Sequence, residues 1–341
     1  MSARVSIRWI AALAGVAGCD PGAPLVSPPA RPAASAAPST SPSPARAAGT
    51  DAPRPAGLVL GRPGDEPRFV LGGPVAAGTS QRVRVRISTS AAAGPEGGPT
   101  VFTGVPGVDL DLEAAAASAP AEVALRIAAA RATGGMPPTG QASPPVDAAL
   151  VSLVNGALQP LSGLVAVAAR RASGVGAGGW AAPWRFTPPA GAAAEAGELL
   201  ANVHDALDPI SLALPDEPLG VGARFTETVP LTGGAGPAML VRTVTVERVD
   251  TAGATVSVGV RWQGTTGGAT APTDRGAGGP SGWLEGEGSG TFEVVPGRPL
   301  PERGSLTFET RRSARLTGDT AATRAPVWRL VTRTTVAVEP R

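Results

Sequence analysis

The chain has 341 residues, enough for one large or two small domains, and 46 Gly with 37 Pro supply about a quarter of them. Its 29 cationic residues are all arginine, and removal of residues 1–18 takes away Arg4 and Arg8. The remaining 27 arginines balance 27 acidic residues, so the chain has no excess positive charge that would favour binding to a nucleic acid. One Cys and one His exclude an internal disulfide and a His-rich metal site, and we expect neither a metal nor another cofactor.

Residues 1–18 have the layout of a signal peptide, with a positive segment at Arg4 and Arg8 before an apolar stretch. That stretch, about ten residues, is too short to cross roughly 30 Å of hydrocarbon as a helix. The following Val16-Ala17-Gly18-Cys19 resembles the lipobox of bacterial lipoproteins. The resemblance implies a lipid on the Cys19 sulfur and a protein held in the bacterial cell envelope, facing the periplasm or the exterior. The alternative is an ordinary secretory signal in which Cys19 is incidental.

Residues 20–56 contain ten Pro, eleven Ala and five Ser, and Leu25 and Val26 are their only sizeable apolar side chains. Such a segment buries too little surface to offset its ordering entropy. We therefore predict that Cys19 and residues 20–56 form a lipidated, disordered tether, and that a β-rich domain outside the cytoplasm occupies 57–341.

From residue 58 onward the sequence shows the period-two alternation of half-buried strands. Three arginines alternate with aliphatic residues, and three carboxylates follow the same period further on: Arg82, Arg84, Arg86, Asp109, Asp111 and Glu113. We predict that the two segments pair with arginines facing carboxylates, a register device worth a few tenths of a kcal/mol per pair. A cation site on the acids or an anion site on the arginines is the alternative.

Further elements follow along the chain. Strands are predicted at 122–133 and 163–172, and apolar helices at 146–158 and 192–207, the second stopped by Pro209. Six more strands are predicted in the C-terminal half: 222–231, 239–250, 254–263, 286–295, 304–316 and 327–338. These elements predict a mainly β fold of the α+β class, with antiparallel meander sheets and two covering helices. A similar order of elements in 57–190 and 191–341 suggests an internal duplication.

Three segments share structural Gly and Pro positions: the turn and strand start over 214–225, the glycine-rich strand over 286–294, and the strand over 307–312. Together with the lipobox and the tether, they resemble a family of uncharacterised bacterial envelope lipoproteins. The resemblance covers roughly residues 58–341. It implies location and fold, and it implies no activity.

The residues that could carry chemistry are few, and no catalytic residue is assigned. His204, with Asp208 one turn later, is either an exposed helix pair or, more remotely, the oriented base of a hydrolase. Residues 174–179 match G-x-G-x-x-G, but no helix start follows, so they are a loop. Trp180, Trp184 and Trp283 are either core anchors or a carbohydrate platform.

These features predict a membrane-anchored lipoprotein that is not an enzyme and that binds a protein or cell-wall partner or acts as a structural element. The alternative is a carrier of a hydrophobic ligand or lipid, because a curved sheet closed by two apolar helices can enclose one. A hydrolase centred on His204 is the third hypothesis.

Overall fold

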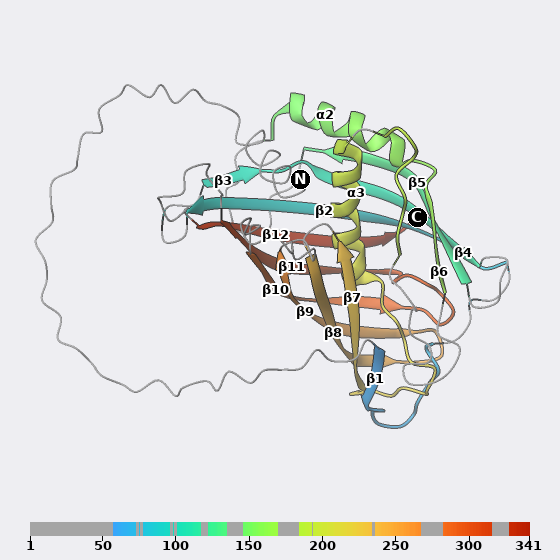
Figure 1. The fold of residues 1–341 in the computed structure, drawn as a ribbon. Helices are drawn as coiled ribbons and strands as arrows, with labels where there is room; N and C mark the ends of the chain where they lie inside the picture. The colour runs from blue at the N-terminus through green and yellow to red at the C-terminus, as the bar shows by residue number, and fades with distance from the viewer. Residues whose placement is uncertain are drawn as a thin grey trace, which may run out of the picture.

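The computed structural model describes residues 57–72, 75, 78–95, 98, 101–116, 122–134, 146–169, 184–192, 194–233, 236–266, 282–315 and 327–341. The predicted signal segment, Cys19, the tether and the loop at 174–179 lie outside these residues. The described part is mainly β, as the alternation predicts, and holds one large antiparallel sheet with two helices (Figure 1).

The N-terminal strands are β1 (Gly57–Arg62), β2 (Ser80–Pro95), β3 (Val101–Gly104), β4 (Gly107–Ala116), β5 (Glu122–Thr133) and β6 (Val165–Ala169). The C-terminal strands are β7 (Arg224–Gly233), β8 (Gly236–Val249), β9 (Ala254–Thr266), β10 (Gly282–Val294), β11 (Arg303–Arg315) and β12 (Val327–Pro340). The helices are α2 (Ala148–Leu158) and α3 (Ala194–Leu207), each followed by a 3-10 turn, η1 (Gln159–Leu161) and η2 (Asp208–Ile210). Pro209 lies in η2, so the second helix ends where the sequence predicts.

The sheet runs in the order β1-β7-β8-β9-β10-β11-β12-β2-β4-β5-β6, with β3 beside β2. Strands β7 to β12 form a meander, in which each strand pairs antiparallel with the next. Two contacts between distant segments complete the sheet, because β1 pairs with β7 and β12 pairs with β2. Both predicted halves, 57–190 and 191–341, therefore contribute to one sheet, and their duplication stays a prediction.

The two faces of the sheet differ in polarity. On β9, Val256, Val258 and Val260 are buried, whereas the residues between them are partly exposed. Residues of both helices, among them Leu158 and Leu200, join the buried face in one apolar core. Figure 1 shows α3 crossing in front of the strands and α2 lying along β5, and strand direction turns progressively between β2 and β7. The helices thus cover the inner face, and the outer face is polar.

A strip of glycines on β10 brings its neighbours close together. Gly286, Gly288 and Gly290 face the same side as the buried Phe292, and a Cβ on Gly288 would lie 2.3 Å from the Cβ of Phe308. Across this strip the rings of Trp262 on β9 and Phe308 on β11 pack with centroids 4.7 Å apart. The missing side chains allow two aromatic residues from non-adjacent strands to meet in the core.

Candidate functional site

The predicted charge ladder lies on the outer face of β2 and β4. The register pairs Arg82 with Glu113, Arg84 with Asp111 and Arg86 with Asp109. The guanidinium Nε atoms lie 2.9, 3.0 and 3.3 Å from the respective carboxylate oxygens. The prediction that these strands pair with opposite charges facing one another is confirmed.

Asp111 is the centre of this ladder and is more crowded than the sequence indicates. Its side chain is 4% exposed, and its second oxygen, Oδ2, contacts Arg131 at 3.2 Å and also Arg341. The hydrogen bond and negative charge of Asp111 raise the pKa of the Arg84 guanidinium above its usual value. One carboxylate thus holds three arginines in place, and the surface around it carries more positive than negative charge.

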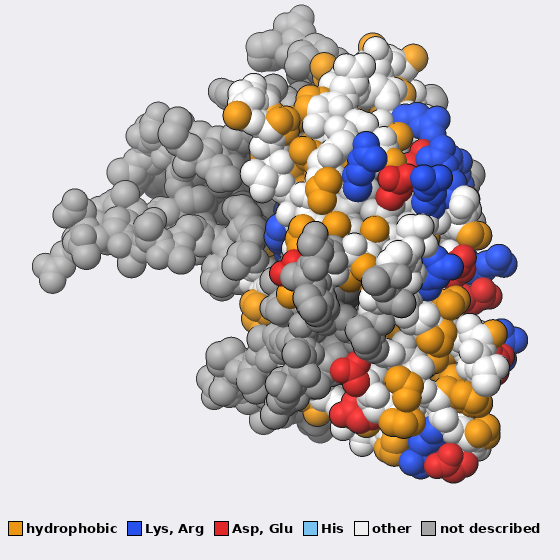
Figure 2. Space-filling view, turned by 90° about the vertical axis from the view of Figure 1, so that its right-hand side faces the viewer, with side chains coloured by type: hydrophobic (Ala, Val, Ile, Leu, Met, Phe, Trp, Pro, Cys, Tyr) orange, Lys and Arg blue, Asp and Glu red, His pale blue; other side chains and the backbone are white. Residues whose placement is uncertain are grey.

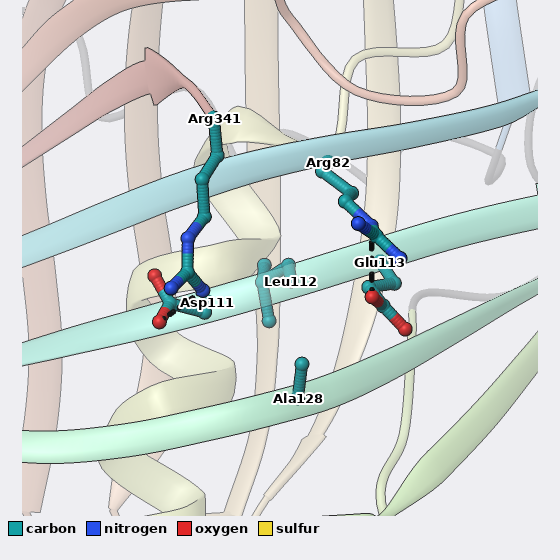
Figure 3. A pocket seen from close by; sticks show the side chains of 6 residues that line it. All are labelled: Arg82, Asp111, Leu112, Glu113, Ala128 and Arg341. Carbon is teal, nitrogen blue, oxygen red and sulfur yellow. Dashed lines mark ion pairs between the residues drawn. The ribbon is translucent and has the colours of Figure 1, made fainter.

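Two adjoining hollows open on this surface. The first has a volume of about 310 Å³ and is lined by Arg82, Asp111, Leu112, Glu113, Ala128 and Arg341 (Figure 3). The second has a volume of about 480 Å³ and is lined by Ser80, Gln81, Arg82, Arg298, Glu302, Pro340 and Arg341. Figure 2 looks at the side of the molecule where β4 and β5 lie in Figure 1, and basic and acidic side chains gather there. The second hollow is mainly polar, the first is lined by both charged and apolar side chains, and Arg82 and Arg341 line both.

The inner face is occupied by the chain itself. Residues 207–215, which leave α3 and pass over the sheet, are all buried, and Ile210 and Leu212 belong to the apolar core. Asp208, in this stretch, accepts two hydrogen bonds from Arg185 at 2.7 and 2.9 Å. Burial raises the pKa of Asp208, and the Arg185 contact opposes that rise.

A buried ion pair lies beneath this segment. Arg242 on β8 and Glu227 on β7 have side chains only 2% and 5% exposed, and their Nε and Oε2 atoms lie 3.4 Å apart. Arg242 also donates a hydrogen bond to the backbone oxygen of Ser211. The sheet thus holds the covering segment by a charged side chain as well as by apolar contacts.

His204 is not the exposed helix pair that the sequence suggested. Its ring is half-buried and stacks on Phe186 with centroids 5.9 Å apart, and its Nε2 atom accepts a hydrogen bond from the Phe186 backbone N–H at 3.0 Å. Burial, aided by the charge of Arg185, lowers the pKa of His204 to about 4. Asp208 pairs with Arg185 rather than with His204. His204 is therefore neutral near pH 7, and the lone pair that a general base would use already accepts the Phe186 amide.

Of the three tryptophans singled out in the sequence, Trp184 is the one whose side chain lies within the described residues. Trp184 is 1% exposed and belongs to the apolar core, so its interpretation as a core anchor is confirmed. Trp180 and the side chain of Trp283 lie outside the described residues.

Sequence reasoning missed Arg131, Arg341 and Arg298, and it also missed the Arg242–Glu227 pair. A signal for the pair exists, because Arg242 and Glu227 each occupy an inward position of an otherwise apolar alternation on neighbouring strands. Arg131 escapes such a search because β5 has an irregularity opposite Asp111 and Leu112, which shifts the alternation by one residue.

Comparison with family models and with the curated proteins finds no match. Among solved structures, the chain is similar to one described as "Lipid-protein interactions in lipovitellin", with 12% identity and a TM-score of 0.39. The similarity covers 78% of this chain and 25% of that one, so the chain spans a quarter of its length. Within the described residues, no helix has the length and apolarity to cross a membrane, and no group of three or more His, Cys, Asp or Glu is placed to hold a metal.

Proposed function

We propose that the chain is a bacterial envelope lipoprotein, anchored through a lipidated Cys19, whose β domain is a non-enzymatic binding or structural module. The support for the anchor is the signal-like segment ending in Val16-Ala17-Gly18-Cys19, together with the fact that Cys19 is the only cysteine of the chain. Two or three acyl chains give durable anchoring, whereas a single chain is reversible. Residues 20–56 would then hold the domain away from the membrane surface.

A binding role for the outer face is supported mainly by the fact that the chain itself covers the inner face. Residues 207–215 and both helices fill the inner face, whereas the outer face carries two arginine-lined hollows. A partner therefore meets polar, charged side chains rather than an apolar interior. The carrier hypothesis would require the covering segment to leave the sheet and to break the Arg185–Asp208 and Arg242–Ser211 contacts.

The anchor is tested by expressing the wild-type chain and Cys19→Ser in a bacterial host. We expect the wild type to lose residues 1–18, gain acyl mass and sediment with membranes, and the variant to do none of these. A wild-type protein that is soluble and unacylated would overturn the proposal. Mass spectrometry of the purified Cys19→Ser chain provides the second readout, because a stoichiometric co-purified lipid would favour the carrier over the binding module.

A further inference from the structure

The second hollow is built from three separate segments, each of which contributes one arginine. Arg82 comes from β2, Arg298 from the turn between β10 and β11, and Arg341 follows β12. Glu302 is the one acidic side chain of the lining. Each arginine is already engaged in a contact of its own, which lowers the entropic cost of binding a ligand.

A buried amide fixes the frame of this hollow. Gln81 is 2% exposed, and its Nε2 atom donates to the backbone oxygen atoms of Leu300 at 2.9 Å and Pro301 at 3.3 Å. Its Oε1 atom accepts from the backbone N–H of Leu300 at 3.1 Å. The turn that carries Arg298 is therefore tied to the start of β2, and the two walls of the hollow keep their spacing.

Each guanidinium is held on one side only. Arg82 contacts Glu113 through Nε at 2.9 Å, Arg298 donates through Nη1 to the backbone oxygen of Ser80 at 2.6 Å, and Arg341 contacts Asp111 through Nη1. A guanidinium has five N–H donors in a fixed fork. Within the described residues, these contacts engage a minority of the donors, so the others remain for a ligand in the hollow.

Several arginines around one hollow favour one kind of anion. A carboxylate offers two oxygens in one plane and is satisfied by one fork, whereas a phosphate group offers three or four oxygens that point in different directions. A phosphate monoester carries between one and two negative charges near pH 7, so it can pair with more than one guanidinium group. The volume of about 480 Å³ admits such a group with part of its substituent.

We propose that the hollow between Arg82, Arg298 and Arg341 binds a phosphate group, either of a free phosphate compound or of a lipid headgroup. This inference deepens the proposed binding role of the outer face, and it does not depend on lipidation of Cys19. The same donors would serve either source, because both present the same oxygens to the three guanidinium groups.

The test uses the full chain carrying Cys19→Ser, purified in neutral detergent, so that no acyl anchor contributes. Titration calorimetry with inorganic phosphate and pyrophosphate is one arm, and flotation with phosphatidylcholine vesicles with and without phosphatidic acid is the other. We expect saturable binding in at least one arm. Arg298→Gln and Arg82→Gln should each weaken it roughly tenfold or more, the effect of losing one charge-assisted contact.

Arg261→Gln is the matched control, because Arg261 is an exposed arginine on β9, outside the hollow. Thermal unfolding of each variant confirms that the fold is retained. Binding in the first arm alone identifies a small phosphate compound, and binding in the vesicle arm alone identifies a headgroup. The proposal is overturned if neither arm shows saturable binding, if acetate binds as tightly as phosphate, or if Arg261→Gln weakens binding as much as Arg298→Gln.

Discussion

Replacing His204 with glutamine is expected to remove the contribution of this side chain to the pH dependence of stability between pH 4 and pH 6.5. The pKa of His204 is lowered from 6.5 to about 4, first by burial and second by the charge of Arg185. The native state therefore binds fewer protons than the unfolded state in this interval. The neutral ring stabilises the fold fully above pH 6.5, and this contribution is lost as the pH falls toward 4.

The magnitude follows from the shift of the pKa from 6.5 to about 4. Each pKa unit corresponds to about 1.4 kcal/mol, which sets an upper limit of about 3 kcal/mol, and the partial exposure of the ring lowers the expectation to about 2 kcal/mol. Asp208 acts in the opposite sense, because burial raises its pKa and its ionisation above pH 3.8 costs stability. His204→Gln leaves that contribution in place, so the difference between wild type and variant isolates the histidine.

The assay is urea unfolding followed by tryptophan fluorescence at a series of pH values. A glutamine Oε1 atom can still accept the Phe186 backbone N–H, so we expect a small loss at pH 7 and a flatter curve below it. His204→Leu, the control, leaves that buried N–H without an acceptor and should cost about 1–3 kcal/mol at every pH. Parallel curves for wild type and His204→Gln would refute the argument, because the chain has no other histidine to produce the slope.

Two further predictions concern the core of the sheet. Gly288→Ala should lower stability by about 1–3 kcal/mol in thermal unfolding, because the added Cβ would lie 2.3 Å from the Cβ of Phe308. The control is Gly259→Ala, because the nearest atom to an added Cβ there is 3.8 Å away. An equal loss of stability in both variants would contradict the packing argument. Arg242→Met should cost about 3–5 kcal/mol because it removes the cation that faces the buried Glu227 carboxylate, and Arg242→Met combined with Glu227→Leu should recover most of this loss in urea unfolding. A double variant no more stable than Arg242→Met would show that the ion pair contributes more than its burial costs.

The strands and their local pairing could be predicted because they follow from alternation alone. To predict that Arg84 faces Asp111, it is enough to know which residues of the two neighbouring segments lie on the same face of the sheet. The observed register pairs these two residues. The turn at 250–253 is similar, since Asp250 accepts hydrogen bonds from the backbone N–H groups of Ala252 and Gly253. Contacts between residues close in sequence leave a local pattern that a reader can find.

Contacts between distant segments leave no such pattern. The pairing of β12 with β2 joins residues more than two hundred positions apart. Likewise, the position of Arg341 beside Asp111 depends on where β12 ends relative to β4. The charge ladder at the centre of the candidate site is therefore predicted from sequence, whereas the positions of Arg131, Arg298 and Arg341 around it are not.

The polar contacts of the inner face bear on whether this face can receive a hydrophobic ligand. An apolar groove that receives a mobile hydrophobic ligand has little need of a fully buried arginine, because an unpaired charge there is costly when the groove is empty. Here Arg242 forms an ion pair with Glu227 and donates a hydrogen bond to the Ser211 backbone oxygen, and Asp208 accepts hydrogen bonds from Arg185. Removing the segment that contains Ser211 and Asp208 would leave both Arg242 and Arg185 without these partners. The charges of the inner face thus hold the chain's own segment in place, which supports the proposal that a ligand is recognised at the outer face.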